Sequence, residues 1–132
     1  MPHLQFEINR SLNDEEKTSF SEEARQLFSK VMDTGTDHIC ISIREYSTYN
    51  LTIGRVKDPA KGVAVVNADI RQGRTMKQRR DLTLGFMELM HKHWGVTKEQ
   101  MYVTLTEHKG EDFHLLEKYL GSWEEGEDPL AD

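Results

Sequence analysis

The stretch Leu4-Gln5-Phe6-Glu7-Ile8 has a counterpart 62 positions later in Val66-Asn67-Ala68-Asp69-Ile70, and this pair decides the fold. In the first stretch apolar and polar residues alternate and the second follows the same pattern, which is typical of a half-buried β-strand. The same shift aligns, without a gap, apolar positions at helical spacing and then a second alternating run. The aligned residues are Phe20, Ala24, Leu27 and Phe28 with Leu82, Phe86, Leu89 and Met90, and Ile39, Ile41 and Ile43 with Met101, Val103 and Leu105. Each half therefore predicts a β-α-β unit.

The repeat predicts one α+β domain with a four-stranded mixed sheet and two helices on one face. Any two β-α-β units share a hydrophobic period, but an alignment without gaps favours duplication. We place the halves at about residues 2–46 and 63–108, within a single domain over residues 1–121 that is followed by an acidic tail over 122–132. The segment between the halves contains Asn50-Leu51-Thr52-Ile53-Gly54-Arg55, which is typical of a hairpin or turn.

Capping residues mark the ends of the two helices. The expected N-caps are Asn13 or Asp14 for the first helix, and Thr75 with Gln78 in a capping-box pattern for the second. Gly35 and Gly95 stand just past the helix ends, where a left-handed residue costs least. After the second half, residues 113–120 predict a short helix that ends at Gly121.

Composition limits the size, partners and compartment of the protein. The 132 residues and 15.3 kDa fit one domain. A hydrophobic content of 36% makes a large self-sufficient core doubtful and favours an oligomer. The net charge of −6 argues against nucleic acid as the main partner. The single cysteine, Cys40, lies in an apolar run and predicts a buried thiol in a reducing compartment. We find no leader and no membrane-spanning run, so we expect a cytoplasmic protein.

Positive charge gathers at the start of the second helix, where it opposes the helix dipole. The first helix opens with Asp14-Glu15-Glu16, the sign that a helix N-terminus prefers. The second helix is instead preceded by the basic segment Arg71-Gln72-Gly73-Arg74. A bound anion would compensate these cations, and a solvated basic turn paired with acids is the alternative. We assign Arg71 and Arg74 to function. The remaining basic residues of this region, assigned to the surface, are Lys77, Arg79 and Arg80.

Pro2 is the second functional signal. Removal of Met1 would leave a prolyl secondary amine at the start of a strand. An α-amino group titrates near ~8, and desolvation or neighbouring cations lower that value, which gives a base, or an acid when protonated, at physiological pH. A proline that is merely tolerated at a strand's first residue is the structural alternative.

Together these features resemble the tautomerase superfamily. The resemblance covers roughly residues 2–107 and is carried by Met1-Pro2 opening a strand, the tandem β-α-β halves, the loop Asn50–Arg55 and the segment Arg71–Arg74. It is greatest for the double-length members similar to cis-3-chloroacrylic acid dehalogenase and malonate semialdehyde decarboxylase. The resemblance implies a tautomerase/MIF-like fold and a homotrimer whose interfaces cover the other face of the sheet.

The resemblance also implies roles for individual residues. In the family the amino-terminal proline is the catalytic acid or base and two arginines bind the substrate carboxylate, which places these roles on Pro2, Arg71 and Arg74. Asp37 resembles the aspartate that the family's decarboxylases use beside the proline. His38 lies near the expected site and is a candidate for substrate binding.

Three positions depart from the dehalogenase pattern. Lys30 stands where the dehalogenases have a histidine, and Thr104 where they have a tyrosine. Glu117 matches their late glutamate only with a two-residue insertion. Thr104 remains a substrate-binding candidate and Glu117 a catalytic one, but the departures argue against hydrolytic dehalogenation.

The expected function is therefore that of a tautomerase acting on a small 2-oxo or unsaturated carboxylic acid. A hydratase, dehalogenase or decarboxylase of the same superfamily is the first alternative. The second is a non-catalytic ferredoxin-like module that binds a small anion, because the order β-α-β-β-α-β also describes such modules, which usually dimerise. We expect no cofactor. We also expect no metal site, since His91 and His93, two apart on a helix, point in different directions.

Overall fold

The two halves fold as two β-α-β units that share one sheet. The structure is a computed structural model that describes residues 2–116 and 118–119. Its main elements are β1 (His3–Ile8), α1 (Asp14–Met32), β2 (Cys40–Glu45), β3 (Ala64–Arg71), α2 (Met76–Trp94) and β4 (Met101–His108). The shorter ones are the 3-10 turns η1 (Pro59–Lys61), η2 (Lys98–Gln100) and η3 (Gly110–Asp112), and the strands β5 (His114–Leu115) and β6 (Lys118–Tyr119).

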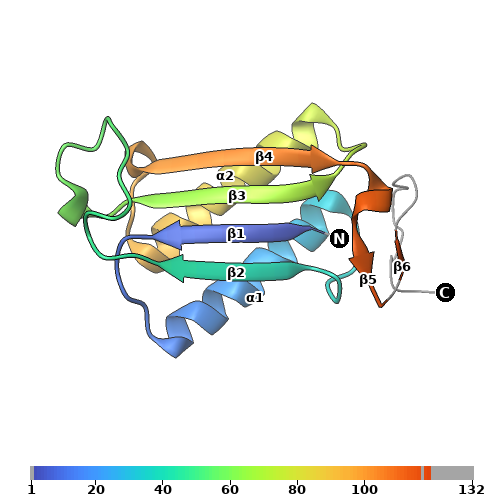
Figure 1. Ribbon diagram of the computed structural model, residues 1–132, viewed down its shortest axis with the longest axis horizontal. Helices are drawn as coiled ribbons and strands as arrows, with labels where there is room; N and C mark the ends of the chain where they lie inside the picture. The colour runs from blue at the N-terminus through green and yellow to red at the C-terminus, as the bar shows by residue number, and fades with distance from the viewer. Residues whose placement is uncertain (1, 117, 120–132) are drawn as a thin grey trace.

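The sheet order is β2-β1-β3-β4, with an antiparallel pair at the centre and a parallel strand on each side (Figure 1). The parallel strand pairs of the two halves have the same residue pairing, shifted by 62 positions. His3 pairs with Cys40, and Val65, 62 positions after His3, pairs with Tyr102, 62 positions after Cys40. The second helix likewise begins and ends 62 positions after the first. The predicted α+β architecture is confirmed.

Both helices pack against the same face of the sheet (Figure 1). Alternation along β1 turns Leu4, Phe6 and Ile8 toward them, and every fourth residue of each helix faces back. Phe6 is the centre of this core. The rings that meet it edge-on are Phe20 at 4.8 Å, Phe86 at 5.2 Å and Trp94 at 6.3 Å between centroids. Burial of such side chains stabilises the fold by about 1.5–3 kcal/mol each. We call the opposite face, which carries the polar residues, the open face.

The helix starts agree with the sequence, and one helix end does not. Asn13 and Thr75 each form a complete capping box. Gly95 is left-handed, with φ 68°, and ends α2 as predicted. The prediction for Gly35 was wrong, because α1 ends earlier, at Met32, and its left-handed C-cap is Asp33, whose φ is 50° and whose N–H donates to the Ser29 carbonyl. Aspartate is among the few residues that tolerate this conformation.

Two further predictions were wrong. Cys40 is exposed, because Ile39 is buried and Ile41 packs on the core, so alternation turns the residue between them toward the open face of an outer strand. The segment predicted as a helix over 113–120 instead forms the short antiparallel pair β5–β6. Leu116 between these strands has φ 54°, which does not fit a helix.

Candidate functional site

The candidate site lies at the end of the sheet where β1 and β2 begin and β3 and β4 end, at the right in Figure 1. Pro2 immediately precedes β1 and is buried, and its carbonyl accepts a hydrogen bond from the Cys40 N–H at 3.1 Å. The antiparallel register that pairs His3 with Asp69 brings Pro2 close to the end of β3, where Arg71 stands. Strand pairing alone thus brings together two residues that the sequence separates by more than one whole repeat.

Arg71 and Arg74 are buried at this end, with exposed fractions of 3% and 8%. Arg71 is the last residue of β3, and Arg74 precedes the N-cap of α2, across a turn in which Gly73 has φ 111°. Burial lowers the pKa of Arg71, and burial followed by the charge of Arg71 lowers the pKa of Arg74 to about 9. Both guanidinium groups remain charged at neutral pH. Two desolvated cations side by side favour an anionic ligand that offers paired oxygens.

His38 and Asp37 stand just before β2 at the same end. The parallel register of β1 and β2 places them beside the beginning of β1. His38 is 4% exposed, and its Nε2 lies 3.4 Å from the Thr34 hydroxyl. Asp37 is exposed. The buried polar side chains among the described residues are Asn9, His38, Arg71 and Arg74, so three of the four are residues that the sequence had singled out.

The structure does not bring Thr104 to this cluster within one chain. Thr104 lies on the open face of β4, and its hydroxyl donates to Asn67 Oδ1 at 3.0 Å. Asn67 pairs with Gln5, three residues along from Pro2. Glu117 lies outside the described residues. The roles of both remain predictions.

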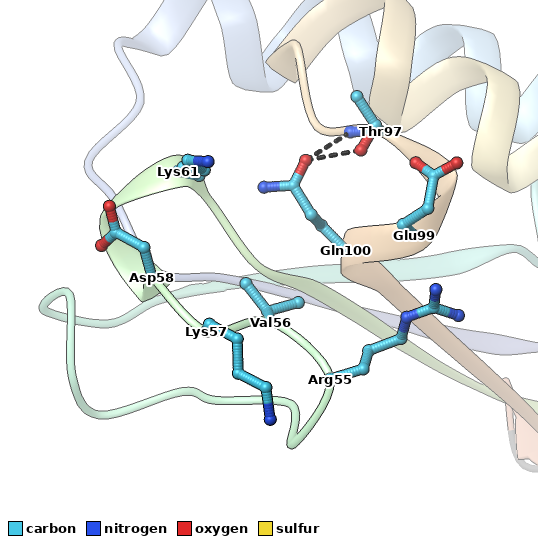
Figure 2. A pocket seen from close by; sticks show the side chains of 8 residues that line it. All are labelled: Arg55, Val56, Lys57, Asp58, Lys61, Thr97, Glu99 and Gln100. Atoms are coloured by element: carbon cyan, nitrogen blue, oxygen red, sulfur yellow. Dashed lines mark hydrogen bonds between the residues drawn. The ribbon is translucent and has the colours of Figure 1, made fainter.

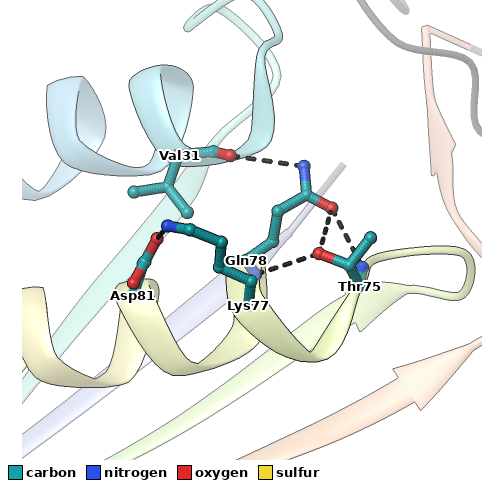
Figure 3. A network of polar contacts seen from close by, with 5 residues as sticks. All are labelled: Val31, Thr75, Lys77, Gln78 and Asp81. Atoms are coloured by element: carbon teal, nitrogen blue, oxygen red, sulfur yellow. Dashed lines mark hydrogen bonds and ion pairs between the residues drawn. The ribbon is translucent and has the colours of Figure 1, made fainter.

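The other basic residues of the turn make surface contacts. Lys77 forms an ion pair with Asp81 one turn along α2, as Figure 3 shows. Arg79 reaches Glu107 on β4 at 2.7 Å, and Arg80 is exposed. Figure 3 also shows the Gln78 amide donating to the Val31 carbonyl, which ties the start of α2 to the end of α1. These contacts are consistent with the assignment of Lys77, Arg79 and Arg80 to the surface, in contrast to the buried Arg71 and Arg74.

A polar group on the open face was missed by sequence reasoning. His108 Nε2 lies 2.9 Å from Asp69 Oδ1, and the second oxygen of Asp69 accepts from Gln5 Nε2 at 2.7 Å. The three residues come from three strands. Their spacing along the chain gives no signal of a site, although alternation does place Asp69 and Arg71 on one face of β3.

A cavity of about 350 Å³ lies at the opposite end of the sheet (Figure 2). It is formed where the segment between the halves meets η2, so the loop Asn50–Arg55 does not approach Pro2 within one chain. The cavity carries both signs of charge. Its ionisable lining residues are Arg55, Lys57, Asp58, Lys61 and Glu99. With acids and bases interspersed, it has no pair of buried cations like the one beside Pro2.

Within the described residues, no cluster of three or more histidine, cysteine or acidic side chains could hold a metal ion. His93 instead contacts Glu23 on α1. No helix in the described part of the chain is long and apolar enough to cross a membrane.

Comparison of the sequence with family models and with curated proteins finds no match. Solved structures do match. The R7 fused 4-OT, an asymmetric trimer, has a TM-score of 0.76 at 21% identity, covering 89% of this chain and 94% of its own. FG41 malonate semialdehyde decarboxylase inhibited by 3-bromopropiolate gives 0.71 at 11%, covering 84% and 86%. Macrophage migration inhibitory factor of Toxoplasma gondii gives 0.75 at 10%, covering 89% and 99%.

These matches define the class of fold. The chain has the fold shared by tautomerase-superfamily structures and by macrophage migration inhibitory factor. The resemblance of the sequence to that superfamily is therefore confirmed for the fold. At sequence identities of 10–21%, these matches show a shared fold alone.

Proposed function

We propose that the protein is a tautomerase that uses Pro2 as acid and base on a small 2-oxo or unsaturated carboxylic acid. The observation that carries the proposal is the burial of Arg71 and Arg74 at the end of the sheet where Pro2 begins the first strand. Two buried guanidinium groups match the geometry of a carboxylate. A prolyl amine beside them has its pKa lowered by their charge and is neutral in part at physiological pH.

In the proposed mechanism the arginines fix the substrate carboxylate and thereby place the adjacent carbon atoms against the Pro2 nitrogen. The neutral amine removes the proton from carbon 3. The electrons of that bond form the double bond between carbons 2 and 3, and the carbonyl electrons move to the oxygen. The charge that develops there is stabilised by the nearby cations, and the proton returns from Pro2 to that oxygen. The reverse sequence converts the enol to the ketone.

The mechanism requires a free amine at Pro2, so we propose that Met1 is removed in the cell. The small side chain of the second residue favours that removal. Intact-mass measurement of the protein isolated from cells checks it, and the expected mass lacks one methionine.

Names of the structural neighbours support small acids as the substrate class. One neighbour is a malonate semialdehyde decarboxylase inhibited by 3-bromopropiolate, and others are fused 4-OT proteins. Decarboxylation is the second candidate here, because Asp37 lies beside the start of β1 and could act with Pro2. We also propose a homotrimer, as in the fused 4-OT structures.

The decisive experiment measures turnover of phenylenolpyruvate and 2-hydroxymuconate by the mature protein and by Pro2→Ala. General acid–base catalysis contributes about 10²–10⁴-fold, so we expect a loss of that size in kcat/KM. Arg80→Gln, which removes an exposed cation, is the matched control and keeps the wild-type rate. Equal rates for wild type and Pro2→Ala would remove Pro2 from the mechanism. Tight carboxylate binding without turnover would favour an anion-binding module instead.

A further inference from the structure

The hydrogen-bonded group His108–Asp69–Gln5 stands beside the proposed site and has no part in the mechanism above. Asp69 uses one carboxylate oxygen for His108 Nε2 at 2.9 Å and the other for the Gln5 amide at 2.7 Å. The carboxylate is thereby fixed from both sides. Because Asp69 is an acceptor, it holds a proton on Nε2 of the imidazole. The other nitrogen, Nδ1, then donates a hydrogen bond only when the ring is protonated.

His108 is the strand partner of Arg71. The two residues face each other in the parallel register of β3 and β4, so their side chains leave the sheet on the same face. The Gln72 N–H also donates to the His108 carbonyl at 2.8 Å, which joins the strand to the arginine turn. The ring of Phe113 meets the imidazole edge-on at 5.5 Å. His108 is therefore oriented on two sides and remains partly exposed, with 37% of its side chain accessible.

The charged groups near His108 come from three elements. Asp69 and Arg71 flank it from β3. On its own strand, Glu107 is engaged by Arg79 of α2 at 2.7 Å. Among these groups, Asp69 bonds the imidazole directly and Arg71 is the strand partner of His108.

The other half of the chain supplies an internal comparison. The positions 62 residues before Asp69 and His108 are Glu7 and Tyr46, and they too are joined across strands, with the tyrosine hydroxyl donating at 2.5 Å. The hydrogen bond to Glu7 raises the pKa of Tyr46 above its ordinary value of 10.0, so the tyrosine hydroxyl is neutral at physiological pH. The position that matches Arg71 is Asn9, which holds the segment between the halves through the carbonyls of Thr48 and Pro59.

Both halves therefore keep a bond between these two positions, but only the half with the buried arginines uses an imidazole. A purely structural bond is already achieved by tyrosine and glutamate. The histidine adds one property to that bond, because an imidazole can carry a positive charge and donate from both of its nitrogens, which a tyrosine cannot.

We propose, resting on the function proposed above, that His108 is a further catalytic residue and Asp69 its positioning residue. The protonated imidazole donates from Nδ1 to the oxygen on the carbon next to the substrate carboxylate. It stabilises the negative charge on that oxygen while Pro2 holds the proton taken from carbon 3, and no proton leaves His108 in the step. Neutral His108 presents a lone pair at Nδ1 and loses this interaction.

The test replaces the His108–Asp69 pair by the tyrosine–glutamate pair that the first half of the chain uses at the matching positions. The double variant is His108→Tyr with Asp69→Glu. This variant keeps the bond between strands and removes the ionisation. We expect kcat for phenylenolpyruvate to fall about 10²-fold, the usual effect of losing one donor to a developing oxyanion, with KM changed less. The pH profile of kcat also differs from that of the wild type, because a tyrosine cannot carry a positive charge. Thr106→Val, which alters another open-face residue of β4, is the matched control and keeps the wild-type profile.

A second variant, Asp69→Asn, tests the positioning role. Replacing the carboxylate by an amide removes the negative charge beside Nε2, so the protonated imidazole loses its counter-charge and kcat falls while KM changes less. In NMR spectra the replacement moves the imidazole signal of His108, and addition of phenylpyruvate moves that signal whether or not turnover occurs.

The possible failures are distinguishable. A wild-type rate in Pro2→Ala overturns the proposed function, and the NMR response to phenylpyruvate then still decides whether His108 faces a bound 2-oxo acid. A large loss in Pro2→Ala together with wild-type kcat and pH profile in the exchanged pair overturns only the role of His108. So does an imidazole signal that responds neither to Asp69→Asn nor to phenylpyruvate.

Discussion

Arg74 shows how a single residue can be unfavourable for the fold and useful to the site. Its pKa is lowered to about 9 by burial and by the charge of Arg71, which means that the folded state disfavours the charged guanidinium. At neutral pH the group is nevertheless charged, so folding bears the cost of its desolvation. A carboxylate bound between the arginines would offset that cost.

We therefore predict that Arg74→Gln weakens carboxylate binding. The KM for a carboxylate substrate rises about 30-fold, because a hydrogen bond to a charged group contributes about 2 kcal/mol. A 2-oxo acid that raises the melting temperature of the wild type no longer raises that of the variant. Steady-state kinetics measure the KM, and thermal melts with and without phenylpyruvate measure the effect of the ligand. A strongly lowered melting temperature with unchanged KM would show that Arg74 only supports the fold.

The sequence predicted the arginines because their charge is misplaced, and it could not predict His108. Arg71 and Arg74 oppose a helix dipole, which is a local property of the chain. The contact of His108 with Asp69 depends on the pairing of two parallel strands, which local sequence does not show. The burial of Cys40 was predicted wrongly because its apolar run was read as buried on both sides, whereas an outer strand of this sheet buries only one.

At the scale of elements, the two helices differ in how their first turns are stabilised. The first turn of α1 contains three acids, whereas that of α2 contains none. The capping box of Thr75 and Gln78 therefore has no electrostatic support, and the same Gln78 also binds the Val31 carbonyl at 3.3 Å (Figure 3).

We predict that Thr75→Ala lowers the free energy of unfolding by about 1 kcal/mol, the usual effect of losing an N-cap. Urea unfolding followed by circular dichroism measures it. Thr52→Ala is the control, since Thr52 is exposed in the segment between the halves and lies outside any helix, so its replacement has a smaller effect. Equal losses in the two variants would argue against the cap as the source of stability.

The contact between α1 and α2 gives a prediction about pH. Hydrogen bonds from Lys92 and then His93 lower the pKa of Glu23. Because the folded pKa lies below the ordinary value of 4.5, the carboxylate stabilises the fold above that value, and the stabilisation is lost as pH falls through the folded pKa. Glu23→Gln is thus less stable than wild type at pH 7, and the difference shrinks in acid.

Chemical unfolding at a series of pH values from neutral to acid checks this prediction. Glu22→Gln, on the same helix but engaged only with residues of that helix, serves as the control. A stability difference between wild type and Glu23→Gln that stays constant into the acid range would contradict it.

The sequence predicted the main elements from periodicity, and the two errors at this scale have local causes. Gly35 was expected to follow the first helix because glycine is the usual left-handed residue there, whereas Asp33 adopts that conformation instead. The segment after β4 has too few residues for a clear period, so its left-handed Leu116 was not foreseen.

For the whole molecule, the outer strands β2 and β4 and the polar open face are available for assembly. Tyr102 on β4 is 54% exposed, which is high for an aromatic side chain on a strand. We predict a homotrimer, with a mass three times 15.3 kDa by light scattering or sedimentation. Tyr102→Lys shifts that mass toward the single chain. A dimer would instead favour the reading as a ferredoxin-like anion-binding module.

The internal repeat also bears on how many reaction centres a complex can hold under the proposed mechanism. Ala64 stands 62 positions after Pro2, but there a peptide bond occupies the nitrogen, and the positions matching Arg71 and Arg74 are Asn9 and Leu12. A polypeptide has a single amino terminus, so two β-α-β units in one chain share one terminal amine. At the other end of the sheet Asn9 instead anchors the connecting segment, donating to the Pro59 carbonyl and accepting from the Val63 N–H.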